Sequence, residues 1–347
     1  MPDVQFVTRY RVLLCLEGRR CKCLKVNRLY KFKKKIIMAY RRRRFYTGAP
    51  VHVYQRTIDG FNIFYDLEDY LVFYTIFATS SRKYNVTVLE QSIMIDHLHS
   101  LIDAASLDEL SRFVCYYTSV YVKAYNRSVG REGALFEKAF GSAPKQTVKK
   151  IKSCIAYIAN NPVEKLLCKS VEDYRWNYLA FAKSSFPYSR PLDISMASAS
   201  LRRAVKEVKS ACRLNRYLNY TQLRRMFRNL SEEESMQLTD IIIACYCPFD
   251  FNYLASFFED FDSMLIAVNA NTGSEYEMSE KFYQHSDREY QEIIVYLKEK
   301  KKMKRIKDVI VLPVEKKMEL YKELRFYTNA DPQQIKKFLH LKADVRW

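Results

Sequence analysis

The sequence lacks any run of about 18 consecutive apolar residues, the length that a membrane-spanning helix requires. Its apolar stretch near the N-terminus covers only residues 12–16, is flanked by arginines, and has no small-residue cleavage site after it. Such a stretch is too short for the core of a secretory signal. These absences exclude a helical membrane protein and predict a cytoplasmic protein with no membrane partner.

Metal-binding cysteine patterns are also missing. The nine cysteines include no pair with the two-residue gap usual in zinc sites, and an odd number argues against a complete disulfide framework. Reduced thiols acting as small apolar residues are therefore favoured over a cysteine metal site. Glycine is scarce too: three of the seven glycines fall within 130–142, which predicts a loop there.

Positive charge, in contrast, is abundant and uneven. The chain has 58 Lys and Arg against 39 Asp and Glu, a net charge of +19, and residues 1–50 alone carry 15 basic and 2 acidic residues. Basic residues mix with aromatic ones at 30–35 and 40–46. Phosphate backbones and anionic membranes both attract such a surface, and the aromatic rings favour single-stranded nucleic acid because they can stack on bases. Residues 1–49 are interpreted as a basic arm, in which a start at Met38 would make 1–37 an upstream extension.

Segments with strand and helix periodicity follow one another between residues 50 and 183. Strands are predicted at 51–57, 86–95 and 97–102. Helices are predicted at 66–83, 106–126 and 144–160, the last ending before Pro162 because the residue before a proline disfavours helical geometry. This alternation within one small unit indicates an α+β fold, a ferredoxin-like antiparallel sheet with helices.

The remainder is predicted to be all-helical. Residues 184–200 contain prolines and several serines and are expected to be a linker. Residues 201–347 form the helical C-terminal region, with a helix-turn-helix-like end at about 315–341. Within it, Asp331 followed by Pro332 is a strong helix start.

Two of the five histidines, His97 and His99, lie two residues apart on a predicted strand. Residues at this spacing point to the same face, so both imidazoles can reach one metal ion. The pair alone also fits two packed histidines. His52, on the first predicted strand, is expected to pack and not to bind metal.

Tyr157 and Asn161 are separated by four residues, about one helical turn, and so face the same way. A phenol and an amide oxygen on one face are what a nucleophile and a third metal ligand require. The chain contains 27 tyrosines, most of which are expected to pack, so this spacing alone does not single out Tyr157.

Taken together, His97-Leu98-His99 and the later Tyr157-Ile-x-x-Asn-Pro helix resemble the single-tyrosine HUH transposases of insertion sequences, and more closely their REP-associated branch. The segments 41–57, 133–136 and 173–176 agree with that family in order and spacing, so the resemblance covers roughly residues 38–181. Two departures stand out. Asp96 occupies a position where the family often has Asn, and Ala139-Phe140 replaces the usual Arg-Tyr after Phe136.

The resemblance implies a ferredoxin-like catalytic domain that cuts and rejoins single-stranded DNA beside hairpins, as a monomer or homodimer. Carried over, His97 and His99 would hold a divalent metal ion, Mg²⁺ or Mn²⁺. Asn161 would be the third ligand, where related enzymes use Gln, and Tyr157 would be the nucleophile that forms a 5′-phosphotyrosine link. The basic residues expected to contact the DNA are Arg41, Arg42, Arg43, Arg44, Arg56, Lys138, Lys149 and Lys150.

Two other functions remain open on the residues alone. A domesticated DNA-binding protein or regulator could use the same fold and basic arm without catalysis. An RNA-binding protein would explain the basic and aromatic composition but leaves the histidine pair without a purpose. Salt-dependent binding without cleavage in the presence of metal would favour either binder over the enzyme.

Overall fold

The computed structural model describes residues 43–137, 140–270 and 286–342. Most of the basic arm predicted at 1–49 lies outside these ranges, as do three of the expected DNA contacts, Arg41, Arg42 and Lys138. These described residues belong to one compact unit.

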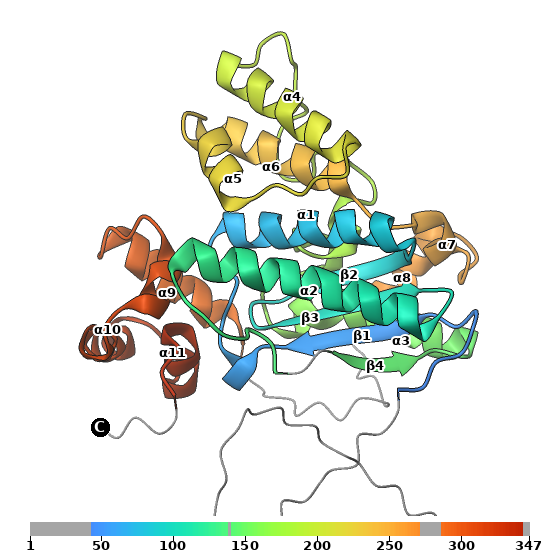
Figure 1. The fold of residues 1–347 in the computed structure, drawn as a ribbon, viewed down its shortest axis with the longest axis horizontal. Coiled ribbons are helices and arrows are strands. Elements are labelled where there is room, and N and C mark those ends of the chain that lie inside the picture. Colours follow the sequence, from blue (N-terminus) through green and yellow to red (C-terminus); the bar gives the residue numbers. More distant parts are fainter. Residues whose placement is uncertain (1–42, 138–139, 271–285, 343–347) are drawn as a thin grey trace, which may run out of the picture. The chain divides into compact units, whose positions relative to one another are not determined.

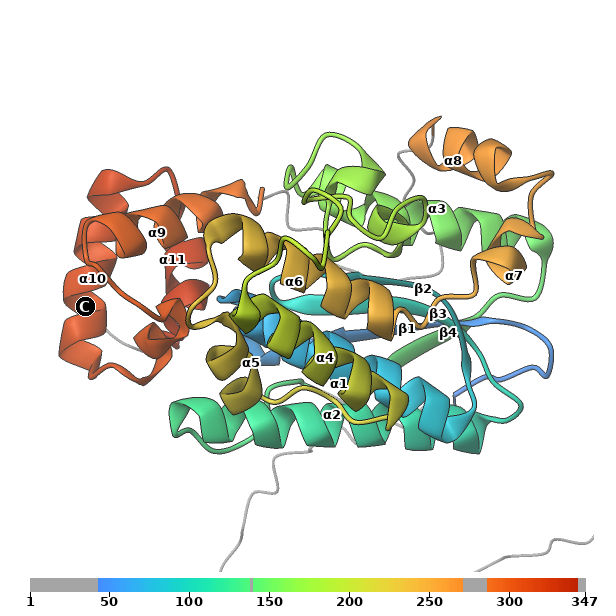
Figure 2. The ribbon, with the colours of Figure 1, turned by 90° about the horizontal axis from the view of Figure 1, so that it is seen from above.

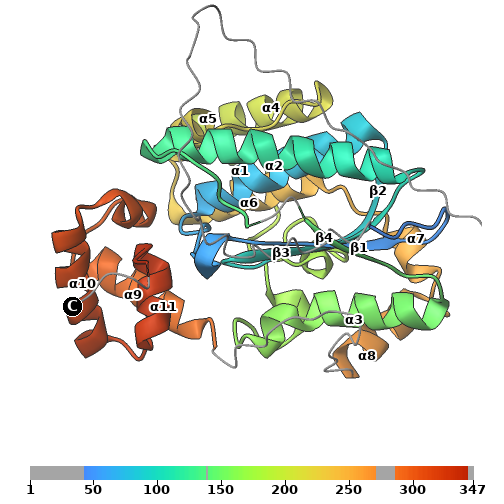
Figure 3. The same cartoon turned by 60° about the horizontal axis from the view of Figure 1, so that its bottom comes forward.

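A four-stranded antiparallel sheet forms the centre of this unit (Figure 1). Its strands, in the spatial order β2-β3-β1-β4, are β1 (Val51–Arg56), β2 (Thr87–Ile93), β3 (His97–Asp103) and β4 (Gly141–Pro144). Helices α1 (Leu67–Tyr84) and α2 (Leu107–Val129) cover one face, and α3 (Val148–Glu164) covers the other (Figure 3). This βαββαβ order confirms the predicted ferredoxin-like α+β fold.

The helices begin where the sequence places their caps. Asp66 is the N-cap of α1, and the Ser106 hydroxyl accepts the Glu109 amide proton at 3.1 Å at the start of α2. At the start of α11 (Pro332–Leu339), the Asp331 carboxylate accepts hydrogen bonds from the backbone amides of Gln333 and Gln334. Each cap satisfies amide groups that the first helical turn leaves unpaired.

The expected end of α3 before Pro162 was wrong. The helix continues to Glu164, and the Asn161 carbonyl accepts the Lys165 amide at 3.2 Å. Proline removes one helical hydrogen bond, but its fixed φ is itself helical, and here only two helical residues follow it. The extra turn keeps Asn161 in helical geometry one turn after Tyr157.

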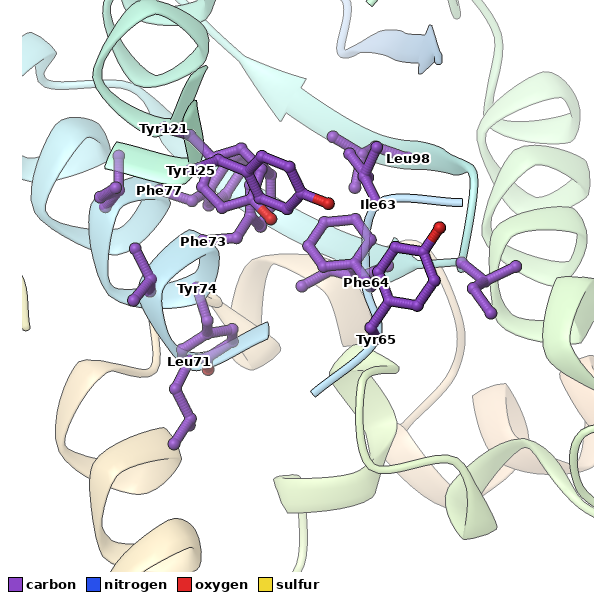
Figure 4. Close-up of a cluster of buried hydrophobic side chains, with 14 of the residues drawn as sticks. Ile63, Phe64, Tyr65, Leu71, Phe73, Tyr74, Phe77, Leu98, Tyr121 and Tyr125 are labelled. Atoms are coloured by element: carbon purple, nitrogen blue, oxygen red, sulfur yellow. The ribbon is translucent and has the colours of Figure 1, made fainter. Parts of the chain in front are cut away.

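The aromatic core lies between α1, α2 and the face of the sheet that these helices cover (Figure 4). Phe73 packs edge-on against Tyr121, with ring centroids 5.1 Å apart, and Phe77 packs against Phe113 at the same distance. Tyr117 and Tyr121 of α2 are at most 2% exposed. Each large side chain buried in this way stabilises the fold by about 1.5–3 kcal/mol.

Outer helices cover the central domain on several sides (Figure 2). They are α4 (Ala199–Arg213), α5 (Tyr220–Phe227), α6 (Glu232–Tyr246), α7 (Phe251–Ala255), α8 (Phe261–Ala270), α9 (Arg288–Glu299), α10 (Val314–Tyr327) and α11. Helices α5 and α6 contact α1, whereas α8 contacts α3. Helices α10 and α11 flank the short turn at 328–331, where the helix-turn-helix-like end was expected.

Residues 184–198, within the expected linker, contain no helix or strand. They nevertheless follow a defined path, because Asp240 of α6 accepts hydrogen bonds from the Tyr188 amide at 3.1 Å and the Ser189 hydroxyl at 2.9 Å. The same carboxylate forms an ion pair with Arg175. The central domain and the helices beyond residue 200 also share one cluster of buried apolar side chains.

A buried ion pair attaches the C-terminal helices to α1. Lys307 and Asp69 are both fully buried and form an ion pair, and the Lys307 ammonium lies 3.7 Å from the centre of the Tyr220 ring. Asp69 also accepts from the Tyr220 hydroxyl at 2.8 Å. Buried charges persist only when they are paired and hydrogen-bonded, as these are.

Candidate active site

The candidate site lies on the face of the sheet that α3 covers. Strand pairing sets Arg56 opposite His97 and Tyr54 opposite His99. Because side chains alternate along strands, His52, Tyr54 and Arg56 share the face of the two β3 histidines. Apolar side chains such as Leu98 and Ile102 point to the opposite face, into the aromatic core.

His99 is completely buried, and its two ring nitrogens have different surroundings. Its Nδ1 lies 3.0 Å from Nε2 of His52, while its Nε2 has no hydrogen-bond partner within the described part of the chain. Burial, followed by the charges of His97, His52 and Arg56, holds the pKa of His99 well below its ordinary range. A neutral ring with one unpartnered buried nitrogen is the form in which histidine binds a metal ion.

His97 is held between a carboxylate and an amide. Its Nδ1 lies 2.6 Å from Oδ1 of Asp96, and its Nε2 lies 3.1 Å from Oδ1 of Asn161. Burial by itself would raise the pKa of Asp96, but the charge of His97 and its hydrogen bond outweigh burial and lower that pKa. Asp96 therefore stays ionised and accepts from Nδ1 of His97. If the ring loses its second proton, the remaining one stays on Nδ1 and leaves Nε2 as an acceptor.

In that neutral form two acceptors, Nε2 of His97 and Oδ1 of Asn161, lie face to face. A second proton on His97 or a cation held by both atoms would satisfy them. Ligand atoms at right angles around a metal with bonds of about 2.1 Å are about 3.0 Å apart, close to the observed 3.1 Å. Together with the unpartnered nitrogen of His99, these atoms fit a divalent metal ion.

No group of three His, Cys, Asp or Glu side chains within residues 43–137, 140–270 and 286–342 is arranged to hold a metal by itself. An amide ligand is therefore required to complete a set of three protein ligands with His97 and His99. Asn161, only 6% exposed, is the residue that contacts His97 from α3.

Tyr157 lies one helical turn before Asn161, on the side of α3 that faces the sheet. Its ring centroid lies 5.4 Å from that of His99 and 5.9 Å from that of His52, with edge-on geometry in both pairs. The side chain is 2% exposed. The fold thus brings together the four residues that the sequence singled out, His97, His99, Tyr157 and Asn161.

The expected DNA contacts are spread more widely. Arg56 flanks His97 across the strand pair. Lys149 and Lys150 are exposed in the first turn of α3, about two turns before Tyr157. Arg43 donates to the Phe140 carbonyl at 3.2 Å and stacks on the Phe140 ring, and Arg44 is exposed. Among the expected contacts that the structure describes, Arg56 therefore lies beside the histidines.

Sequence reasoning missed two residues beside the site. His52, expected only to pack, contacts His99 directly, and the alternation of β1 could have suggested its face but not its partner. Asp287 precedes α9, and its amide donates to the Lys165 carbonyl at 2.9 Å. Burial, then the charge of Asp96, raises the pKa of Asp287 to about 7. Nothing in the sequence links Asp287 to β3, because more than a hundred residues separate them.

A comparison with protein families agrees with the resemblance seen in the sequence. Residues 30–161 match the family model described as "Transposase IS200 like". A solved structure described as a REP-associated tyrosine transposase bound to a REP hairpin is similar to 41% of this chain over 84% of its own length, at 14% identity and a TM-score of 0.34. Among curated proteins, no sequence matches the chain. In the described residues no helix is long and apolar enough to cross a membrane. Residues 30–161, which include both histidines and Tyr157, are therefore similar in sequence to IS200-like transposases.

Proposed function

We propose that this protein is a metal-dependent endonuclease and strand transferase that acts on single-stranded DNA carrying hairpins. The observation that carries the proposal is the placement of a tyrosine ring 5.4 Å from a buried histidine that has an unpartnered nitrogen. The contact between His97 and Asn161 supplies the other two ligand atoms. A protein that only binds DNA has no need for this combination.

In the proposed reaction the Tyr157 oxygen attacks the phosphorus of a DNA phosphodiester. A bond from that oxygen to phosphorus forms, the bond from phosphorus to the 3′ oxygen breaks, and the phenolic proton is lost while the 3′ oxygen gains one. The products are a 5′-phosphotyrosine link and a free 3′-hydroxyl. Attack by a 3′-hydroxyl on the link reverses these steps and joins strands without an external energy source.

His97, His99 and Asn161 would hold Mg²⁺ or Mn²⁺. When bound, the ion would neutralise charge on the scissile phosphate and favour the phenolate of a group whose pKa is ordinarily near 10. Asp96 orients the His97 ring, and His52 orients that of His99. The His97 side chain is 14% exposed, whereas the other two ligands and Tyr157 are more deeply buried, so the phosphate is expected to enter beside His97.

The test uses labelled single strands with hairpins, incubated with Mg²⁺ or Mn²⁺ and analysed on denaturing gels for a covalent protein–DNA adduct. Tyr54, which shares the site face, provides a matched control. The adduct should form with wild type and Tyr54→Phe and be absent with Tyr157→Phe. An adduct that forms with Tyr157→Phe but is lost in Tyr54→Phe would show that Tyr54, and not Tyr157, is the nucleophile. Tight binding by wild type without an adduct under either metal would support the non-catalytic regulator instead.

A further inference from the structure

A strongly basic surface lies on α4 and α5, outside the transposase match and outside the site described above. Residues 199–230 contain nine Arg and Lys but only one acidic residue, Glu207. The net charge of the whole chain is +19, of which residues 1–50 contribute +13, so all later residues together contribute +6. Residues 199–230 alone have a net charge of +8, and the other residues after 50 are slightly acidic in sum. Charge beyond the N-terminal arm is therefore concentrated here.

The cations of α4 form an ordered stripe. Arg202, Lys206, Lys209 and Arg213 are exposed and follow one another at spacings of four, three and four residues, which places them on one helix face over about 16 Å. Like charges at these spacings destabilise a helix. Among the described residues, no carboxylate lies within ion-pair distance of any of the four. The nearby acidic residue of α4, Glu207, pairs instead with Arg225 of α5.

A solvated helix face usually carries both signs of charge, and α10 of this protein does. Its glutamates at 315, 319 and 323 are interspersed with Lys and Arg, and Glu323 pairs with Lys301. The single sign of the α4 stripe differs from this pattern and is typical of a surface that meets an anionic partner.

The stripe borders a hollow of about 770 Å³ between α2, α4 and α5, which we name the α4–α5 groove. Arg203, Lys206 and Arg216 line it together with the amide side chains of Asn215 and Gln222. The Glu207 carboxylate lines it too, and its charge is paired with Arg225. Tyr116 and Tyr217 also line it and present aromatic rings. Cations that neutralise phosphates, amides that donate to them and rings that stack on bases are the groups with which proteins hold a nucleic-acid backbone.

This hollow cannot be part of the candidate active site. Helices α4 and α5 lie on the same side of the sheet as α1 and α2, while α3, which carries Tyr157, lies on the other side (Figure 3). The transposase match ends at residue 161, well before α4 begins.

We propose that the α4–α5 groove is a second DNA-binding surface that holds the phosphate backbone of DNA extending from the cut site. The inference rests on the proposed function in taking DNA as the ligand. Its contacts are to phosphates and carry no sequence information. A single strand or a duplex could supply the same backbone chemistry, and the salt dependence of binding separates these two sources.

The experiment measures affinity for a hairpin-free 20-nucleotide strand and a 20-base-pair duplex between 50 and 200 mM NaCl, with full-length Tyr157→Phe protein to prevent cleavage. The groove variant adds Arg203→Gln, Lys206→Gln and Arg216→Gln. A distant control instead adds Lys123→Gln, Lys169→Gln and Lys298→Gln, which removes the same charge from other exposed positions. Arg203→Lys with Arg216→Lys keeps the groove charge.

Each phosphate contact contributes about 0.9 to the slope of log K against log salt on duplex DNA and about 0.7 on a single strand. The groove variant should therefore lose up to about 2.7 slope units on duplex or about 2.1 on single strands, and each lost contact lowers affinity about 8-fold on duplex at 100 mM salt. The distant control and the Arg→Lys variant should keep slopes near those of the parent.

A slope change on only one substrate would identify that form of DNA as the occupant. Slopes unchanged on both substrates, or lowered equally by the distant control, would overturn the inference. Adduct formation on a short hairpin strand, measured with Tyr157 restored, separates the two proposals. If the groove variant keeps the parent's salt slope while the adduct still forms, only the second DNA-binding surface is contradicted. If the groove variant lowers the slope but wild-type protein forms no adduct, only the proposed nuclease activity is contradicted.

Discussion

Replacing Asp96 should weaken metal binding without removing a ligand. The carboxylate lies 2.6 Å from Nδ1 of His97, and the two side chains are 22% and 14% exposed, so solvent screens the contact only in part. A hydrogen bond to a charged group contributes about 1.5–3 kcal/mol, roughly twice that of a neutral one. Asp96→Asn, which can still accept through its amide oxygen, should lose about half of this, and Asp96→Ala should lose all of it.

These energies convert directly into metal affinity. At 1.36 kcal/mol per tenfold change, Asp96→Asn should raise the half-saturating Mn²⁺ concentration about 4- to 13-fold, and Asp96→Ala about 13- to 160-fold. The assay is adduct formation as a function of Mn²⁺ concentration, with Asp103→Asn, at the far end of β3, as a control. High Mn²⁺ should restore the adduct in both Asp96 variants. Equal half-saturation in wild type, Asp96→Asn and Asp96→Ala would refute the orienting role.

Two further predictions concern stability. Lys307→Met leaves the fully buried Asp69 carboxylate without its cation and should lower the free energy of unfolding by about 3–5 kcal/mol in urea titrations. Lys304→Met, at an exposed position nearby, should change that free energy by less than about 0.5 kcal/mol. Equal effects of the two substitutions would contradict the anchoring role of the ion pair. Burial lowers the pKa of His340 to about 3, so the folded chain leaves this ring neutral while the unfolded chain protonates it below pH about 6.5. Stability should therefore fall with falling pH, by up to about 2 kcal/mol between pH 6.5 and 5 from this residue, and His340→Asn should remove that part of the slope; an identical pH dependence in the variant would show that the ring does not titrate on unfolding.

Sequence patterns determined the local parts of this protein. Alternation along β3 placed His97 and His99 on one face, helical spacing placed Tyr157 and Asn161 on one face, and capping residues marked where α1, α2 and α11 begin. These features depend on residues close together in the chain, so the periodicity of the strand or helix that contains them is sufficient to predict them.

Only the tertiary structure decided which of these faces meet. The register between β1 and β3 brings His52 against His99, and the packing of α3 under the sheet brings Asn161 against His97. Helix α3 also continues past Pro162, where local geometry predicted its end. Asp287 interacts with the charge of Asp96 because the C-terminal helices pack against the central domain, to which its own amide is hydrogen-bonded at Lys165. Such contacts join residues far apart in sequence, and strand register and core packing, which no local periodicity records, select them.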